Sequence, residues 1–219
     1  MMLKTILFVS LSVFALAACS PAPQNTSPAP TASAMATPVS SMPANWEAPQ
    51  TSLTFLSSKI NQQLNSVTEQ SQFTSSHAML DKQGNFKMMV DLNSVQTNIE
   101  IRDQRIKDWV FQTAQFAMAE ITGKVDMNVI HQLQLGESVS FKQPLMLNIH
   151  GKELPIEAHL SAQRTQADKI MVSTLSPVVL DTKAMDMSQG VMQLVEVMGL
   201  KTIVEQIPVS FHAEFMRKE

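Results

Sequence analysis

The sequence has 219 residues, of which 44% are hydrophobic and 16% are charged, so it holds enough apolar material for the core of one ordinary domain. Its formal net charge is −3. Proteins that bind nucleic acids usually concentrate an excess of Lys and Arg, so this balance argues against a nucleic-acid partner.

The first 18 residues have the features of a secretory signal peptide. Lys4 precedes an apolar run over residues 6–16, which ends at small residues and at Cys19, the only cysteine of the chain. This run has 11 residues, well short of the roughly 20 that a membrane-spanning helix needs. We therefore interpret residues 1–18 as a signal peptide and expect no transmembrane helix in the mature protein.

The tetrapeptide "LAAC" that ends at Cys19 resembles the lipobox of bacterial lipoproteins. The resemblance implies cleavage before Cys19 and acylation of this residue, which would attach the protein to a membrane. The alternative is a free or disulfide-bonded cysteine, but the chain offers no second cysteine as a partner. By the same resemblance, Ser20 in the following position implies an outer-membrane lipoprotein that faces the periplasm.

Residues 19–50 are expected to be the acylated cysteine followed by a tether. Residues 20–50 contain seven of the 11 prolines, are otherwise rich in Ala, Ser and Thr, and carry no charge before Glu47. Such a composition is typical of an extended linker. The folded domain is therefore predicted to cover residues 51–219.

In this domain apolar residues alternate with polar ones, which predicts β-strands with one buried face. The longest alternating run covers residues 117–129, and hairpin-length breaks that contain glycine occur at residues 81–85 and 150–153. Similar alternation occurs in Phe86/Met88/Val90/Leu92, Leu145/Leu147/Ile149, Leu154/Ile156/Ala158/Leu160 and Ile207/Val209/Phe211/Ala213/Phe215. We expect eight or nine strands in an antiparallel sheet.

Two segments have helical spacing instead. One lies around residues 106–110, and the other covers residues 191–198, with Ser188 as a possible N-cap and Gly199 at the C-terminal cap. Strands with one apolar face can pack as a sandwich or close into a barrel, and the pattern alone does not separate the two. The chain also has 16 methionines, whose flexible side chains suit either a core or an adaptable binding surface.

Four segments, taken in chain order, resemble the YceI-like family. They are "SLTFLSSK" near the start of the domain, "DLNSVQTNIEIRDQRIKDWVFQTAQFAMAEITGKV" at 91–125, "PLMLNIHGKELPIEAHL" at 144–160 and "GLKTIVEQIPVSFHAEF" at 199–215. The resemblance covers roughly residues 51–217. It implies an all-β fold, a lipocalin-like antiparallel β-barrel of about eight strands with two short helices. It also implies that the interior holds a long apolar lipid, a polyisoprenoid or a polyprenyl quinone, and no cofactor.

The alternation and the family resemblance together predict the residues that line this interior. They are Phe73, Met79, Phe86, Met88, Val90, Ile121, Val125, Met127, Leu147, Ile149, Ile156, Leu160, Val209 and Phe211. Arg102 and Arg164 are candidates for contact with a polar head group at the barrel mouth. The alternatives are an internal salt bridge for Arg102 and a strand-end position in water for Arg164.

Residues 100–108 form a dense charge cluster, with three acidic and three basic side chains. Because these charges balance, the cluster is predicted to fasten a helix rather than to capture a phosphate. The spacings Asp103/Lys107 and Arg105/Asp108 suggest ion pairs on one helix surface, while Ile106, Trp109 and Val110 face the barrel end.

No metal site or catalytic site is expected. His150, His159 and His212 lie on the polar faces of three different runs, and His77 is predicted to be a hydrogen-bonded core histidine. The chain has no Gly-x-Ser-x-Gly or His-Glu-x-x-His sequence. Three hypotheses remain: a lipid carrier, a filled barrel that acts through a protein partner or in the response to envelope stress, and, less favoured, a hydrolase without a recognisable motif.

Overall fold

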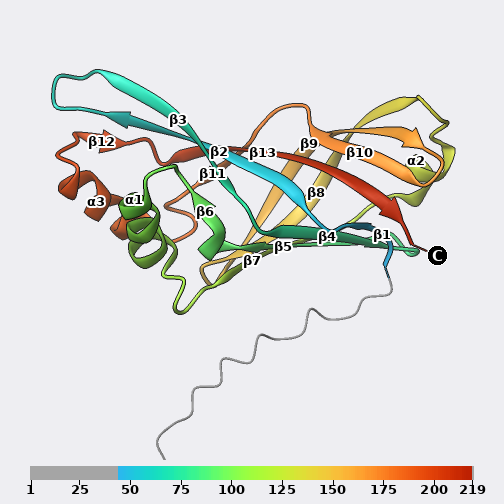
Figure 1. The fold of residues 1–219 in the computed structure, drawn as a ribbon, viewed down its shortest axis with the longest axis horizontal. Helices are drawn as coiled ribbons and strands as arrows, with labels where there is room; N and C mark the ends of the chain where they lie inside the picture. The colour runs from blue at the N-terminus through green and yellow to red at the C-terminus, as the bar shows by residue number, and fades with distance from the viewer. Residues whose placement is uncertain (1–43, 219) are drawn as a thin grey trace, which may run out of the picture. The chain divides into compact units, whose positions relative to one another are not determined.

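The computed structural model describes residues 44–218, in which thirteen strands form one antiparallel sheet (Figure 1). The strands are β1 (Ala44–Ala48), β2 (Thr51–Ile60), β3 (Ser66–Phe73), β4 (Ser76–Asp81), β5 (Asn85–Asp91), β6 (Val95–Gln96), β7 (Met118–Lys124), β8 (Ser138–Ile149), β9 (Lys152–Gln166), β10 (Lys169–Thr174), β11 (Val178–Asp181), β12 (Thr202–Ile203) and β13 (Gln206–Arg217).

The sheet closes into a barrel because β1 pairs with β4 on one side and with β13 on the other. Around the barrel the order is β1, β4, β5, β7, β8, β9, β10 and β13, which makes eight strands. Closure removes the exposed edges that an open sheet would have. The short strands β11 and β12 pair with β13 and β2, and β2 and β3 extend the wall at one end. The prediction of an eight-stranded antiparallel barrel is confirmed.

The two predicted hairpin turns have the backbone that their glycines suggest. Gly84, between β4 and β5, has φ +84°, and a Cβ there would lie 2.2 Å from the carbonyl oxygen of Val125. Between β8 and β9, His150 and Gly151 have φ +51° and +71°. Positive φ at both central residues is the geometry that matches the twist of two hairpin strands.

Helices lie at both ends of the barrel (Figure 1). They are the 3-10 helix η1 (Leu92–Ser94), α1 (Glu100–Arg105), the π-helix η2 (Ile106–Phe111), α2 (Met127–Gln132) and α3 (Ser188–Val197). The helices predicted around residues 106–110 and 191–198 are thus present as α1 with η2 and as α3. Within the described residues, no helix has the length and apolar character needed to cross a membrane.

The caps of α3 agree only in part with the sequence. Gly199 has φ +60°, and the amides of Gly199 and Leu200 donate to the carbonyls of Glu196 and Val195, as in a Schellman motif. Ser188 does not cap the N-terminus. It lies inside the helix, and its hydroxyl donates to the carboxylate of Glu205 instead.

Helix α2 was not predicted, because residues 117–129 were expected to be one strand. Strand β7 ends at Lys124, and α2 begins after Asp126, whose carboxylate accepts a hydrogen bond of 2.9 Å from the amide of Asn128. An aspartate in this position is a strong N-cap, and it overrides the alternation that continues to Val129. The i, i+3 spacing of Ile130 and Leu133 was the signal for this helix.

The barrel also begins earlier than residue 51. Strand β1 lies in the segment assigned to the tether, yet Trp46 is 3% exposed and Ala48 is fully buried. The high proline content of residues 20–50 led to the assignment of these five residues to the tether. They complete the barrel, because they pair with β4 on one side and with β13 on the other. The predicted signal peptide and residues 19–43 of the predicted tether lie outside the described residues.

Candidate functional site

The barrel encloses an apolar cavity of about 190 Å³, which we call the lumen. Only two of its lining side chains are polar, Gln143 and Thr174, and none is charged. The lining residues are Trp46, Leu53, Phe73, Leu80, Phe86, Met88, Val90, Leu92, Ala119, Ile121, Val125, Ile130, Phe141, Gln143, Leu145, Leu147, Ile149, Ile156, Ala158, Leu160, Ile170, Val172, Thr174, Val178, Leu180, Val209, Phe211 and Phe215.

Twelve of the fourteen predicted lining residues border this lumen. The pleat explains the agreement, because alternate residues of a strand point to the same face and the apolar alternates face inward. The twelve are Phe73, Phe86, Met88, Val90, Ile121, Val125, Leu147, Ile149, Ile156, Leu160, Val209 and Phe211. Their contact with a ligand remains a prediction.

The other two, Met79 and Met127, do not line the lumen. The break between Phe73 and Ser76 changes which residues point inward, so Leu80 faces the lumen on β4 in place of Met79. A register change of one residue moves a side chain to the other face of a sheet. Met127 is the first residue of α2 rather than part of β7.

The sequence prediction also missed sixteen of the lining residues. Leu145 belongs to the alternating run that was recognised on β8 but was not selected as a lining residue, and extending that run to Phe141 would have included this residue too. Short alternating runs in β10 and β11 supply further members of the wall. Trp46 gave no such signal, since it lies in a proline-rich stretch, and Gln143 was not selected because it is polar.

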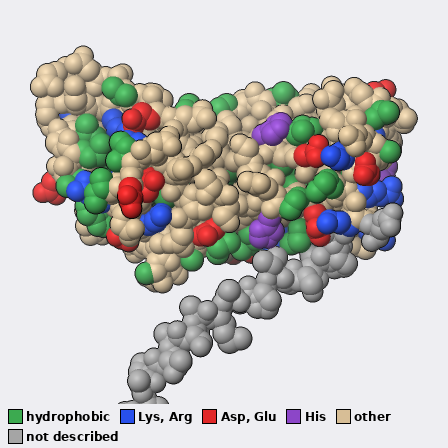
Figure 2. Space-filling model, viewed as in Figure 1, with side chains coloured by type: hydrophobic (Ala, Val, Ile, Leu, Met, Phe, Trp, Pro, Cys, Tyr) green, Lys and Arg blue, Asp and Glu red, His purple; other side chains and the backbone are tan. Residues whose placement is uncertain are grey.

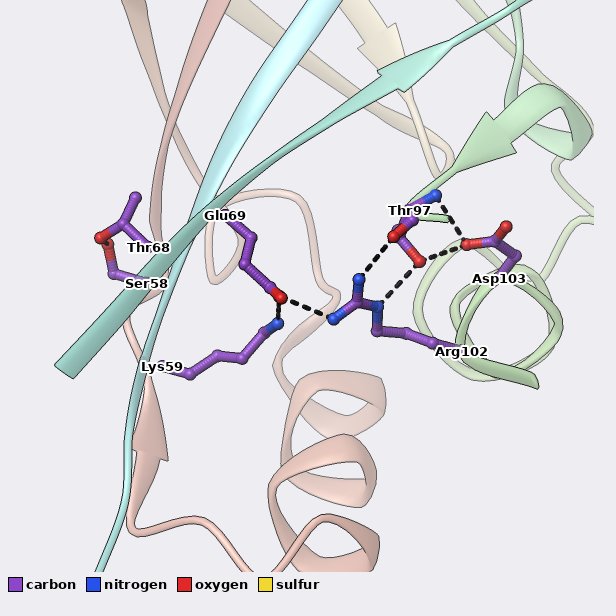
Figure 3. A network of polar contacts seen from close by, with 7 residues as sticks. All are labelled: Ser58, Lys59, Thr68, Glu69, Thr97, Arg102 and Asp103. Carbon is purple, nitrogen blue, oxygen red and sulfur yellow. Dashed lines mark hydrogen bonds and ion pairs between the residues drawn. The ribbon is translucent and has the colours of Figure 1, made fainter. Parts of the chain in front are cut away.

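The predicted charge cluster is part of a polar network at the α1 end of the barrel (Figure 3). Arg102 Nη1 lies 2.7 Å from Glu69 Oε2, and Lys59 pairs with the same carboxylate oxygen. Arg102 also donates to the carbonyl oxygen of Thr97 at 2.6 Å and to its hydroxyl at 2.8 Å. Asp103 accepts hydrogen bonds from the amide and hydroxyl of Thr97.

This network ties α1 to the strand pair β2 and β3. Burial, together with the neighbouring Arg102 guanidinium, lowers the pKa of Lys59. Burial also lowers the pKa of Arg102, although Asp103 opposes the shift. The Glu69 carboxylate is therefore the anion that two partly buried cations share. This arrangement fits a fastener, and Arg102 does not border the lumen.

The ion pairs expected from spacing within the cluster are not formed among the described residues. Asp103 contacts Thr97, as above, and Asp108 accepts from Gln104 Nε2 at 2.9 and 3.0 Å. The guanidinium carbon of Arg105 lies 5.5 Å from the centre of the Trp109 ring, a distance at which a cation interacts with an aromatic face. Asp103, Asp108 and Arg105 thus contact other nearby residues in place of the expected ion partners.

The apolar side of this segment packs on the barrel and on α3. Val110 is buried in the core, and Phe111 packs against the lumen residue Phe73 with ring centres 5.8 Å apart. A Cβ at Gly190 of α3 would lie 2.0 Å from the carbonyl oxygen of Trp109, so only glycine allows this approach. The expected apolar packing of η2 at the barrel end is present, although its own side chains do not line the lumen.

Arg164 lies at the other end of the barrel, where it is hydrogen-bonded to the end of α2. It donates to the carbonyl oxygens of Ile130 and Leu133 at the end of α2, at 2.9 and 2.7 Å, and to that of Ala167 at 2.9 Å. Its guanidinium also lies 5.7 Å from the ring centre of Trp46. These contacts make Arg164 a C-terminal cap of α2. For both arginines, contact with a lipid head group remains a prediction.

The histidines do not gather in one place. His159 and His212 are exposed, and His77 is half-buried with Nε2 unpartnered among the described residues rather than hydrogen-bonded. His150 is 8% exposed and packs on Phe116, with ring centres 4.5 Å apart. Across residues 44–218, no three His, Cys, Asp or Glu side chains form a metal-binding group. On the face seen in Figure 2, acidic and basic side chains are interspersed.

Comparison with known proteins agrees with this geometry. A solved structure described as a polyisoprenoid binding domain from Saccharophagus degradans, implicated in plant cell wall breakdown, is 28% identical with a TM-score of 0.75. The match covers 80% of this chain and 99% of that one. BcnA from Burkholderia cenocepacia is 14% identical with a TM-score of 0.54, over 75% and 95% of the two chains, which supports the fold alone. No curated protein matches the chain.

A family model described as the YceI-like domain matches residues 44–215, from the first residue of β1 into β13. The match includes the closed barrel, the α1 network and all the residues that line the lumen. The chain therefore belongs to the YceI-like family, as its sequence motifs indicated.

Proposed function

We propose that this protein binds an apolar lipid of the isoprenoid class inside the barrel and carries it within the cell envelope. The observation that carries the proposal is the lumen itself, a cavity of about 190 Å³ whose wall is apolar except for Gln143 and Thr174. Binding pockets for small molecules are commonly apolar with a few polar groups. The polyisoprenoid-binding domain with the same fold supports the choice of ligand.

The volume indicates how much lipid fits without rearrangement. An engineered apolar cavity of about 150 Å³ admits one benzene molecule, so a lumen of 190 Å³ holds roughly eight carbon atoms, or one to two isoprene units. A longer chain requires the aromatic side chains in the wall to rotate, or part of the chain to remain outside. Because the lumen has no charged wall residue, the enclosed part of the ligand must be neutral.

We further propose that acylated Cys19 anchors the protein in the outer membrane, with the barrel in the periplasm. The support is the lipobox-like sequence, the signal peptide before it and Ser20 after it. Between Cys19 and β1 lie residues 20–43, whose composition is that of a linker. A Cys19→Ala variant should lose labelling by a palmitate probe, and continued labelling would contradict acylation at this residue.

A second candidate is a barrel that acts through a protein partner. The elements at the α1 and α3 end carry several exposed apolar side chains, an arrangement that can mark an interaction surface. Ile101 and Met192 are 58% and 62% exposed, and Leu64 in the turn after β2 is 67% exposed. This candidate requires a packed lumen that retains no lipid.

The test is to purify the full chain from a bacterial envelope under native conditions, and to combine native mass spectrometry with organic extraction. A bound isoprenoid in stoichiometric amount is expected. Met88→Asp places a carboxylate in the lumen and should abolish this lipid, whereas Met146→Asp, at an outward position that is 40% exposed, should retain it. A wild-type protein that is empty and does not take up added isoprenoids would favour the second candidate.

A further inference from the structure

Gln143 is the one buried amide in the wall of the lumen. It lies on β8 between the inward-facing residues Phe141 and Leu145, and it is 5% exposed. Thr174, the other polar lining residue, uses its hydroxyl locally, because it donates to the carbonyl and accepts from the amide of Phe211. In the amide of Gln143, by contrast, only the amino group forms hydrogen bonds within the described residues.

The hydrogen bonds of Gln143 fix the orientation of its amide. Nε2 donates to the carbonyl oxygens of Lys124 at 3.1 Å and of Pro144 at 2.8 Å. Both partners are acceptors, so the amino group must face them and the side chain has one correct orientation. Oε1 is therefore the acceptor that remains: no hydrogen bond to it is formed within residues 44–218, and it is not one of the fully buried unpartnered atoms there.

A second polar atom in the same wall is also unpartnered. Trp46 is 3% exposed and borders the lumen, and its Nε1 has no hydrogen-bond partner within residues 44–218. The row of paired residues that begins at Trp46 passes through Leu80 and Phe86 to Gly123, and a Cβ at Gly123 would lie 3.6 Å from Gln143 Nε2. Gln143 on β8 therefore lies four strands from Trp46 on β1, across the lumen from it.

Buried polar atoms without partners are unfavourable, and most buried polar groups in proteins are hydrogen-bonded. A hydrocarbon ligand offers nothing to either atom, and an ether or a carbonyl offers no proton to Oε1. A hydroxyl group has a proton to donate, so it complements the amide oxygen.

We propose that Gln143 Oε1 accepts a hydrogen bond from a hydroxyl group on the enclosed end of the ligand, so that the lumen selects isoprenoid alcohols. This inference rests on the proposed lipid-binding function and names the ligand class within it. A diphosphate or other charged group does not fit here, because no charged side chain lines the lumen.

The experiment measures the affinities of the full-length protein for three probes with the same ten-carbon geranyl skeleton by native mass spectrometry titration. The probes are geraniol, geranyl methyl ether and 2,6-dimethylocta-2,6-diene, which differ only at one end. We expect geraniol to bind about 3- to 10-fold more tightly than the other two, the range that one net hydrogen bond supplies. In Gln143→Met this preference should disappear while binding of the hydrocarbon is retained.

The control is Gln193→Met, which makes the same change at an exposed position of α3 and should leave the preference intact. If the wild-type protein binds all three probes equally, or if Gln143→Met keeps the preference for geraniol, the inference is wrong while the lipid-binding function stands. If the wild-type protein binds none of the probes, both the inference and the proposed lipid-binding function are wrong. The wild-type series decides the question even if the Gln143 variant does not fold.

Discussion

Replacing Ala119 with leucine should partly fill the lumen and thereby stabilise the protein. Ala119 lies on β7, is 3% exposed and lines the lumen. An unfilled apolar cavity costs about 24 cal/mol per Å³, so a lumen of 190 Å³ corresponds to about 4 to 5 kcal/mol of stability relative to a filled core. Under the proposed function, this loss of stability follows from keeping space free for the ligand.

The size of the gain follows from the carbon atoms that are added. Leucine has three more side-chain carbons than alanine, and each buried carbon contributes about 0.8 kcal/mol, so the upper limit is about 2.4 kcal/mol. After some strain, we expect a gain of about 1 to 2 kcal/mol, which raises the melting temperature by about 2 to 8 °C. The same side chain removes ligand space and should weaken geraniol binding about 10- to 50-fold.

The matched control is Ala162→Leu on β9, because Ala162 is fully buried in the core but does not line the lumen. Added volume there has no space to fill, so this variant should lose about 1 to 3 kcal/mol. Thermal unfolding followed by circular dichroism measures both variants. Equal destabilisation of the two would show that the lumen is already filled, and a stabilised Ala119→Leu with unchanged affinity would place the ligand elsewhere.

Three further predictions concern the contacts that position the barrel ends. Glu69→Ala should cost about 1 to 2 kcal/mol, more than Arg102→Ala, because it leaves two partly buried cations without their shared carboxylate. Gly190→Ala should cost more than about 2 kcal/mol, because its Cβ would overlap the carbonyl oxygen of Trp109 and push α3 away. Wild type should lose its stability advantage over Glu205→Gln as the pH falls below about 4.3, the ordinary pKa of glutamate.

The sign of the third prediction follows from the contacts of Glu205. Burial by itself would raise its pKa, but hydrogen bonds from Ser188 and Thr182, with help from Lys183, lower it below the ordinary value. A carboxyl whose pKa is lower in the folded state stabilises the protein above its unfolded pKa, and this stabilisation is lost as the pH falls through the folded pKa. An advantage that does not change with pH would contradict the assignment.

Urea unfolding at fixed pH measures the first two predictions, and a pH series of the same measurement checks the third. Gln193→Ala, at an exposed position of α3, controls for Gly190→Ala and should change stability by less than about 0.5 kcal/mol. A tolerated Gly190→Ala would mean that α3 does not need its close approach to η2. A Glu69→Ala variant as stable as wild type would remove the fastening role of the α1 network.

The sequence alone determined twelve of the 28 residues in the wall of the lumen, because side-chain alternation is a local property of a strand. Residues such as Met88, Leu147 and Phe211 face inward whatever the partner strands are, and their apolar parity is visible in the chain. The turns at Gly84 and Gly151 were equally local, since a backbone with positive φ favours glycine. The family motifs supplied the barrel, which alternation did not distinguish from a sandwich.

The tertiary structure decided what depends on closure and on partners distant in sequence. The inclusion of β1 depends on its pairing with β4 and β13, and Met79 is buried but does not line the lumen, because the break between β3 and β4 shifts the parity. Arg102 pairs with Glu69, 33 residues earlier, rather than with its helical neighbours. The orientation of Gln143 depends on a carbonyl of β7. Local spacing shows which face a residue occupies, but contacts across the barrel exist only once the chain has closed.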